Sequence, residues 1–215
     1  MDKISQKVAK ILLEVGAVTL NPKKPYRYSS GILSPVYTDC RILISYPRER
    51  KQIRDLYIKT IKDSKVKFDI VAGTSTAGIP HASWIADKLN IPMIYARGSA
   101  KDHGKGNQVE GRLEKGQKAI VIEDLISTGE SSVITAKGIK DIGGKVSYVL
   151  AIITYGMEKA TKNIKENKLK LVTLTTFKDV LEVARKMGKI SKKEQEIVNQ
   201  WTQDTAGWGK KMGFE

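Results

Sequence analysis

Short apolar runs alternate with segments of helical spacing through the middle of this chain, and this alternation constrains the fold more than any other feature. The strand-like runs cover residues 68–73, 91–97, 118–124 and 145–155, and the helical segments cover 77–90 and 128–144. Strands that alternate with helices form βαβ units, in which the strands are parallel and helices cover both faces of the sheet. We therefore expect an α/β fold with a central parallel sheet flanked by helices.

The two ends of the chain add further elements. A first helix is indicated by apolar residues on one face, Ile4, Val8, Ile11, Leu12 and Val15, with Gly16 as its C-cap. Residues 20–41 are rich in Pro, Ser, Gly and Tyr, which favours short strands and turns. The remaining elements are a helix over 46–63, a strand over 170–177 and two helices around Val180 and Ile197.

Residues 98–116 form a long connection with little apolar content. A segment of this kind is either disordered or a lid over an active site. Arg97, Lys101 and His103 place cations near its start. The plainer interpretation is a solvated basic loop.

Composition narrows the function classes without choosing among them. Lys and Arg number 38 against 23 Asp and Glu, which gives a formal net charge of +15. This surplus favours nucleic acid, phosphate-bearing metabolites or a membrane surface, although a lysine-rich proteome would produce it without functional meaning. Cys40 is the single cysteine, which excludes an internal disulfide. The two histidines lie far from it in sequence, so we expect no zinc site.

Charges interrupt every apolar run of the N-terminal segment. It therefore lacks the unbroken apolar stretch of a signal peptide, and nothing downstream is long enough to cross a bilayer. We expect a cytoplasmic protein.

The stretch VIEDLISTGES, residues 121–131, joins a predicted strand to a predicted helix. It would open at the carboxyl end of a parallel strand, where open α/β sheets bind ligands. The first turn of the helix presents unpaired N–H groups and the positive end of its dipole, which suits phosphate. Ser127, Thr128 and Ser131 can add hydroxyls, and Gly129 leaves those amides unblocked. No Lys follows in the Walker A pattern.

Two adjacent acids, Glu123 and Asp124, precede this cradle. They could accept hydrogen bonds from the vicinal hydroxyls of a ribose and stabilise positive charge that develops on the sugar. Each residue alone has a plainer explanation, since Asp often caps a helix and Ser-Thr-Gly is common in loops. The ordered run of strand, two acids, two apolar residues and Ser-Thr-Gly instead predicts a ribose 5-phosphate site.

The same residues resemble a known family. AIVIEDLISTGESS is similar to the motif with which type I phosphoribosyltransferases bind 5-phosphoribosyl 1-diphosphate. The segments YSSGILSPVYTDCRILISYP, GTSTAGIPHA, ARGSAKDHGKGNQVEGRLEKGQKAIVIEDLISTG and AIITYG resemble, in order, the orotate phosphoribosyltransferases. The resemblance covers most of residues 16–156, and KDHGKGNQVEG and SSGILSPVYTD are the parts that point to orotate.

This resemblance implies a type I phosphoribosyltransferase fold. The expected organisation is a single domain over 1–215, with a hood at about 16–45, a core at about 50–180 and C-terminal helices at about 177–215. The implied reaction joins orotate and phosphoribosyl diphosphate into orotidine 5′-monophosphate and pyrophosphate, with Mg²⁺ held mainly by substrate oxygens and water. A lid that reaches the neighbouring subunit's site implies a homodimer.

The resemblance also assigns roles to residues. Lys101 and Asp124 are the implied catalytic residues. The phosphoribosyl diphosphate is assigned to Arg97, Lys101, His103, Glu123, Asp124, Leu125, Ile126, Ser127, Thr128, Gly129, Glu130 and Ser131, with Thr74, Ser75 and Thr76 in a pyrophosphate loop. Orotate is assigned to Ser127, Tyr37 and Thr38. Apart from the resemblance, Tyr37 reads as a cross-strand packing residue next to an ordinary Ser-Pro turn.

The pyrophosphate loop lies in GTSTAG, which differs from a nucleophile elbow because Ala77 replaces the last glycine. We interpret the nearby His81 as a helix residue with a local hydrogen bond. The chain departs from some family members at Ser29, Gly98, Glu130 and Tyr155, and these positions concern the choice of base. Alternative functions are a phosphoribosyltransferase for another base, or a non-catalytic regulator that senses the ribosyl donor or binds nucleic acid, although no nucleic-acid motif is present.

Overall fold

A computed structural model describes residues 1–28, 30–98 and 108–214 of the chain. The chain divides into two compact units. One consists of Pro47–Leu174, and the other consists of Met1–Tyr46 together with Thr175–Glu215. We call them the sheet unit and the terminal unit. No helix in the described ranges combines the length and the apolar character needed to cross a membrane.

The sheet unit is built on a six-stranded sheet with the strand order β10-β9-β8-β5-β6-β7. The strands are β5 (Ile70–Thr74), β6 (Met93–Ala96), β7 (Val109–Glu110), β8 (Lys118–Ile126), β9 (Lys145–Thr154) and β10 (Lys170–Thr176). β5 pairs in parallel with β6 and β8, and β8 pairs in parallel with β9. The short β7 is antiparallel to β6. The expected central parallel sheet is confirmed, with one antiparallel strand at its edge.

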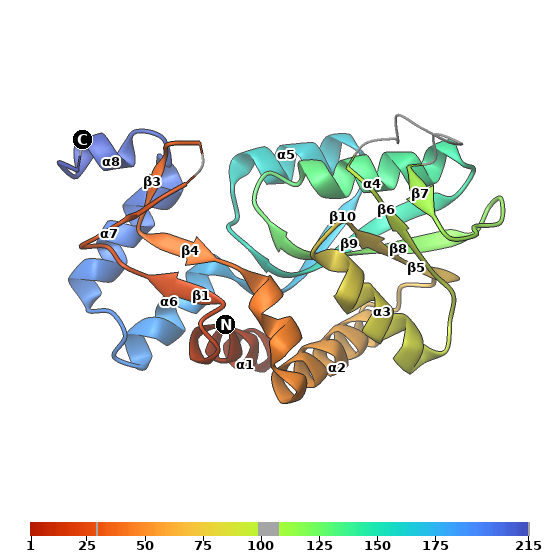
Figure 1. Cartoon of the computed structure of the whole chain (residues 1–215), viewed down its shortest axis with the longest axis horizontal. Coiled ribbons are helices and arrows are strands. Elements are labelled where there is room, and N and C mark those ends of the chain that lie inside the picture. Colours follow the sequence, from red (N-terminus) through yellow and green to blue (C-terminus); the bar gives the residue numbers. More distant parts are fainter. Residues whose placement is uncertain (29, 99–107, 215) are drawn as a thin grey trace. The chain divides into compact units, whose positions relative to one another are not determined.

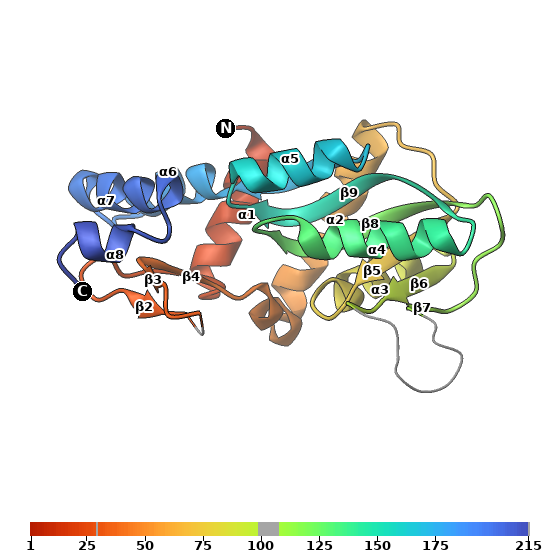
Figure 2. The same cartoon turned by 90° about the horizontal axis from the view of Figure 1, so that it is seen from above.

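Helices cover both faces of this sheet. They are α2 (Pro47–Asp63), α3 (Gly78–Leu89), α4 (Glu130–Asp141) and α5 (Glu158–Glu166). Figures 1 and 2 show α4 and α5 on one face and α2 and α3 on the opposite face. This is the two-sided packing that the near-continuous apolar runs of the strands require, since parallel strands are buried on both faces.

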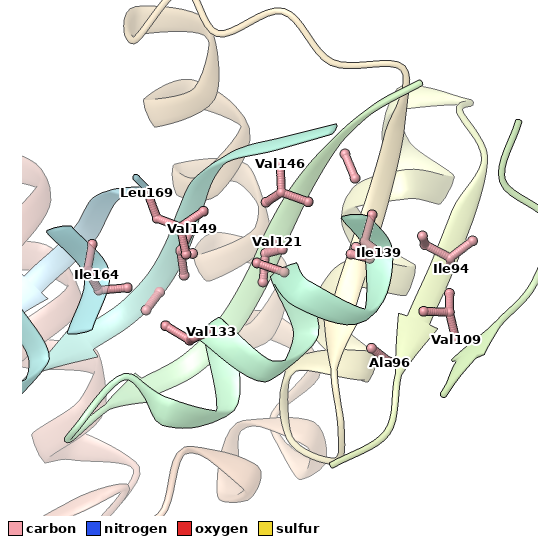
Figure 3. Close-up of a cluster of buried hydrophobic side chains, with 14 of the residues drawn as sticks. Ile94, Ala96, Val109, Val121, Val133, Ile139, Val146, Val149, Ile164 and Leu169 are labelled. Atoms are coloured by element: carbon pink, nitrogen blue, oxygen red, sulfur yellow. The ribbon is translucent and has the colours of Figure 1, made fainter. Parts of the chain in front are cut away.

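A hydrophobic cluster fills the space between the sheet and helices α4 and α5 (Figure 3). Its larger members are Ile70, Ile94, Val109, Val121, Ile126, Val133, Ile139, Val146, Val149, Ile164 and Leu169. Each fully buried aliphatic side chain of this size stabilises the fold by about 1.5–3 kcal/mol. The cluster therefore fixes α4, and with it the connection that precedes α4, firmly against β8.

The terminal unit combines helices with two small antiparallel ribbons, in which β1 pairs with β4 and β2 with β3. Its elements are α1 (Lys3–Glu14), β1 (Val18–Leu20), β2 (Tyr26–Arg27), β3 (Leu33–Ser34), β4 (Val36–Thr38), the 3-10 helix η1 (Cys40–Ser45), α6 (Phe177–Lys186), α7 (Lys192–Gln203) and α8 (Trp208–Lys211). α1 packs on α6, and the Ser5 hydroxyl donates to Asp179 Oδ2 at 2.6 Å. The first and last segments of the chain thus fold together.

Several element boundaries differ from the sequence-based expectation. α1 has Val15 as its C-cap, and Gly16 follows with a positive φ of 75°. β8 continues to Ile126 instead of ending at Asp124, and α4 covers Glu130–Asp141 within the predicted helical segment 128–144. The short elements β7, α5 and α8 were not predicted.

Candidate active site

Two strand-to-helix connections lie at the same edge of the sheet. β5 leads through residues 75–77 into α3, and β8 leads through residues 127–129 into α4. We call these connections the α3 crossing and the α4 crossing. Because β5 and β8 are parallel neighbours, both crossings leave from the carboxyl edge, where open α/β sheets bind ligands. No side-chain cap closes the start of α3 or α4. The first-turn N–H groups of α4 are suited to an anion. In α3, Pro80 has no N–H and the Ile79 amide donates to the Thr76 carbonyl at 3.3 Å, so an anion there would meet the amides of residues 76–78.

The α4 crossing is an open turn. Gly129, its last residue, has a φ of 76°, a left-handed conformation that glycine adopts without strain. The Asn163 side chain on α5 donates from Nδ2 to the Thr128 carbonyl at 2.9 Å, which anchors the turn from outside. Ser127 and Ser131 are exposed and Thr128 is half-buried. The crossing therefore presents hydroxyls next to the free amides of the helix, as its sequence predicts.

The two acids before this crossing have different surroundings. Glu123 is buried, with 5 % of its surface exposed, whereas Asp124 is half-buried. Glu123 Oε1 accepts a hydrogen bond from the Asp124 amide at 3.2 Å, and Ser132 Oγ lies 3.4 Å from Glu123 Oε2. Burial, followed by the charge of Asp124, raises the pKa of the Glu123 carboxyl well above its ordinary value. Of the two acids, Glu123 is therefore the one whose charged form is disfavoured by burial, and Asp124 is the more accessible one.

The other predicted residues of this motif lie on either side of the turn. Leu125 is half-buried and Ile126 is buried, both within β8, while Glu130 is exposed at the start of α4. The Lys159 ammonium lies 2.6 Å from Glu130 Oε1. This ion pair offsets the acidic charge that Glu130 brings to a predicted phosphate site.

The α3 crossing is closed toward the protein. Ser75 Oγ donates to the Ala96 carbonyl at 2.6 Å, and the Ser75 amide donates to the same oxygen at 3.0 Å. Thr74 is buried, and its hydroxyl has no hydrogen-bond partner among the described residues. Thr76 is exposed. The three predicted hydroxyls of the pyrophosphate loop thus lie together, but only that of Thr76 belongs to an exposed residue.

Gly78, the first residue of α3, ends the GTSTAG segment, but the sequence analysis assigned it no role of its own. A Cβ atom at this position would lie 2.4 Å from the Ile122 carbonyl oxygen and 3.3 Å from the Glu123 Cα. The start of α3 therefore packs directly on the backbone of β8, just before the two acids. A glycine that follows a strand and opens a helix in GTSTAG was the available sequence signal.

Arg97 follows β6 at the same edge. Its guanidinium forms a salt bridge of 3.0 Å with Glu110 of β7, and Gln108 Nε2 donates to the Arg97 carbonyl at 3.1 Å. Lys101 and His103, the other predicted cations, lie outside the described residues. Their assignment therefore remains a prediction.

The predicted orotate contacts lie in both units. Ser127 belongs to the sheet unit, while Tyr37 and Thr38 belong to β4 of the terminal unit. The Tyr37 ring is 43 % exposed and lies 5.7 Å, between ring centroids, from Tyr26. Ser29, one of the positions that differ from some family members, is outside the described residues. The roles of Tyr37 and Thr38 remain predictions.

His81 lies inside the sheet unit on α3. Its exposed fraction is 2 %, and burial lowers its pKa to about 4, so the ring is neutral at physiological pH. Its Nδ1 atom has no hydrogen-bond partner among the residues described, so the local hydrogen bond expected from the sequence is not found at that atom. The ring instead packs edge-on against Trp84, at 5.3 Å between ring centroids.

Metal binding by protein ligands alone has no basis in the described ranges, which contain no cluster of three or more His, Cys, Asp or Glu side chains. The half-buried Asp124 carboxylate is an oxygen ligand of the kind that Mg²⁺ prefers. The edge therefore combines two uncapped helix starts with the accessible carboxylate of Asp124. Such an arrangement can bind a sugar that carries phosphate groups at both ends.

Comparison with known proteins agrees with this geometry. The family model for the phosphoribosyl transferase domain matches residues 43–186. An orotate phosphoribosyltransferase from Enterococcus faecalis is 46% identical over 210 residues, which cover 98% of this chain and 100% of the relative.

Two solved structures are also similar. The crystal structure of orotate phosphoribosyltransferase from Aeropyrum pernix has a TM-score of 0.70 and 29% identity, and the match covers 84% of this chain and 99% of that chain. The structure of Leishmania donovani UMP synthase has a TM-score of 0.77 and 26% identity, over 93% of this chain and 42% of that longer chain. The fold, the ordered motifs and these matches together show that the chain belongs to the phosphoribosyl transferase domain family and, within it, to the orotate phosphoribosyltransferases.

Proposed function

We propose that this protein transfers the 5-phosphoribosyl group of phosphoribosyl diphosphate to orotate, which yields orotidine 5′-monophosphate and pyrophosphate for the synthesis of UMP. The observation that carries the proposal is the pair of uncapped helix starts at one sheet edge, with Asp124 near the carboxyl end of β8, the strand that leads into α4. The relatives named orotate phosphoribosyltransferases support the choice of base.

The α4 crossing is proposed to bind the 5-phosphate of the ribosyl group. Its amides from Thr128 to Ser131 and the exposed hydroxyls of Ser127 and Ser131 are suited to phosphoryl oxygens. Asp124 accepts hydrogen bonds from the ribose hydroxyls and stabilises positive charge on the sugar as the bond from C1 to the diphosphate breaks. The carboxyl of Glu123 accepts a hydrogen bond from the backbone N–H of Asp124.

The α3 crossing is proposed to bind the diphosphate. The amides of residues 76–78 face charge that accumulates on the leaving pyrophosphate, together with the predicted residues Thr74, Ser75 and Thr76. Of these three, only Thr76 is exposed, and the Ser75 hydroxyl orders the turn by its bond to the Ala96 carbonyl. Arg97 and the predicted lid residues Lys101 and His103 add cations, and closure of that segment excludes water from the reacting sugar. Orotate is proposed to lie near Ser127, Tyr37 and Thr38, with its ring nitrogen placed against C1.

The residues of this edge fit a Mg²⁺ ion that arrives with the ribosyl donor. Mg²⁺ keeps several waters and binds through one or two carboxylates plus phosphate oxygens, so a protein cage is not required. Asp124 would hold it together with oxygens of the substrate. When bound, the ion neutralises charge on the diphosphate.

The remaining proposals concern assembly and location. We propose one functional domain over residues 1–215, a homodimer in which the lid segment reaches the neighbouring site, and a cytoplasmic setting, without nucleic acid or membrane as a partner. Sedimentation analysis of the purified chain tests the dimer, and a monomer at catalytic concentrations with full activity would refute it.

The direct test is incubation with orotate, phosphoribosyl diphosphate and Mg²⁺, followed through the loss of orotate absorbance. We expect loss that depends on all three, and orotidine 5′-monophosphate as the product. A parallel panel with uracil, adenine, guanine and hypoxanthine tests specificity, and turnover of one of these bases in place of orotate would contradict the proposal. So would steep salt-dependent binding of RNA or DNA without any nucleotide product.

A further inference from the structure

The peptide group that joins Glu123 to Asp124 is held at both ends by side chains. Its carbonyl, that of Glu123, accepts a hydrogen bond of 2.6 Å from the Tyr57 hydroxyl. Its N–H, that of Asp124, donates to the carboxyl of Glu123 at 3.2 Å. A peptide fixed at both its oxygen and its nitrogen cannot rotate freely, and its orientation sets the direction of the Asp124 side chain.

The position of this peptide in the sheet explains why a side chain is needed. β8 pairs with β5 only from Ala119 to Ile122, and the register between them ends one residue before Glu123. Beyond that point the start of α3 packs on β8, because Gly78 has no side chain to prevent it. A buried carbonyl without a hydrogen-bond partner is costly, and Tyr57 of α2 supplies the partner.

Tyr57 is well placed to hold a fixed geometry. Its side chain is fully buried, and the buried residues Ile53 and Ile61 lie one helical turn before and after it on α2. Its ring centroid lies 6.3 Å from that of His81 on α3. Tyr57 therefore joins α2, α3 and the end of β8 at one point, and close packing restricts the movement of its hydroxyl.

We propose that Tyr57 is a positioning residue for the transfer reaction, because its hydroxyl holds the Glu123–Asp124 peptide so that Asp124 faces the ribose of the ribosyl donor. This inference rests on the proposed function, in which Asp124 binds the ribose hydroxyls. Tyr57 does not touch the substrate in this account. It acts 66 residues away in sequence, through a backbone atom, and no local motif marks it.

The test compares Tyr57→Phe, which removes only the hydroxyl, with Ile61→Val, which removes one buried methyl group one turn further along the same helix. For both variants, Tm is measured by calorimetry, and affinities for ribose 5-phosphate and for pyrophosphate are measured separately by titration. Both substitutions remove buried interactions, so both are expected to lower Tm.

The two variants should differ in ligand binding. Tyr57→Phe should weaken the affinity for ribose 5-phosphate about three- to tenfold, the loss typical of one hydrogen bond, while the affinity for pyrophosphate stays unchanged. Ile61→Val should change neither affinity. In steady-state kinetics, Tyr57→Phe should raise KM for the ribosyl donor and leave KM for orotate unchanged.

Two results would overturn the inference about Tyr57 and leave the proposed function intact. One is an unchanged affinity of Tyr57→Phe for ribose 5-phosphate, and the other is an equal loss of both ligands, which would indicate a general structural defect. If the wild-type protein binds no ribose 5-phosphate, the proposed function fails and the inference fails with it. Wild-type binding together with a selective loss in Tyr57→Phe supports both.

Discussion

The α3 crossing and the α4 crossing begin at neighbouring parallel strands, but they are built in opposite ways. The α3 crossing turns inward, since Ser75 bonds the Ala96 carbonyl and Gly78 rests on the backbone of β8. The α4 crossing turns outward, with exposed Ser127 and Ser131 and a left-handed Gly129. The first offers mainly amides to a ligand, and the second offers amides, hydroxyls and a nearby carboxylate.

This difference suggests how one sheet edge can distinguish two phosphate-bearing groups. A pyrophosphate needs N–H groups and positive charge. A turn whose hydroxyls face the protein can still supply both, through its backbone amides and the positive end of the helix dipole. A ribose 5-phosphate also carries hydroxyls, and these need an acceptor such as Asp124 beside the turn. The account therefore assigns the two ends of one substrate to two separate crossings, and each substitution below should disturb one of them.

The largest effect is expected for Asp124→Asn, which removes the negative charge beside the α4 crossing. Loss of a preorganised electrostatic contact of this kind lowers kcat/KM by about a hundred- to a thousandfold. The matched control is Asp141→Asn at the far, exposed end of α4, which should leave kcat/KM unchanged. Steady-state kinetics checks both, and a change of less than twofold for Asp124→Asn would remove the ribose contact from the mechanism.

Gly78→Ala should break the contact between the α3 crossing and β8. The new Cβ would meet the Ile122 oxygen at 2.4 Å, so α3 or β8 must shift, and we expect the free energy of unfolding to fall by about 3 kcal/mol. Gly98→Ala is the control, because a Cβ there meets nothing within 4 Å and should change stability by less than about 0.5 kcal/mol. Urea unfolding measures both, and equal stabilities would show that the close packing is not required.

Smaller effects are expected for Ser75→Ala and Asn163→Ala, and each variant should weaken the binding of a different ligand. Ser75→Ala removes the bond to the Ala96 carbonyl and should weaken pyrophosphate binding, whereas Asn163→Ala removes the bond to the Thr128 carbonyl and should weaken ribose 5-phosphate binding. Each loss should be about three- to tenfold on one ligand only. Titration calorimetry with both ligands provides the four affinities. If each variant weakened both ligands alike, the two crossings could not be separate sites.

The smallest effect is a difference in pH dependence. Burial raises the pKa of Glu123, so above the ordinary pKa the folded state holds a proton that the unfolded state has released. The stability that this group contributes is therefore lost as the pH rises from the ordinary pKa of a glutamate through the raised pKa of Glu123. Burial lowers the pKa of His81 to about 4, so the unfolded state binds the extra proton and stability is lost as pH falls from 6.5 to about 4.

Melting curves of two variants, recorded at several pH values, separate the contributions of Glu123 and His81 to the pH dependence of stability. Relative to wild type, the Tm of Glu123→Gln should improve as pH rises from 5 to 8, and that of His81→Gln should improve as pH falls from 6.5 to 4. If the Tm of the wild-type protein changed with pH in the same way as the Tm of both variants, burial would not shift the pKa of either group.

The fold could be predicted where one physical signal is strong and local. Apolar runs of Ile and Val predicted the strands β5, β8 and β9, because parallel strands are buried on both faces. The end of β8 was placed two residues early, since Glu123 and Asp124 look like the end of a strand although the pairing with β9 continues to Ile126. α5 was missed because its buried face consists only of Ala160 and Ile164.

The candidate site was predictable in its outline and not in its inner contacts. The hydroxyls and glycine of the α4 crossing are adjacent in sequence, so their grouping was visible. The burial of Glu123 depends on Ser132 and on the packing of α4, and the Tyr57 hydrogen bond joins residues 66 positions apart. Contacts of that range follow from the packed fold and leave no local pattern.

The central claim is that the two crossings bind different ends of one substrate, and amide chemical shifts test it most directly. In the ¹⁵N-labelled protein, saturating ribose 5-phosphate should shift the amides of Thr128, Gly129, Glu130 and Ser131, and saturating pyrophosphate should shift those of Thr76, Ala77 and Gly78. If both ligands shift the same amides, or if neither set responds, the assignment of the two crossings is contradicted.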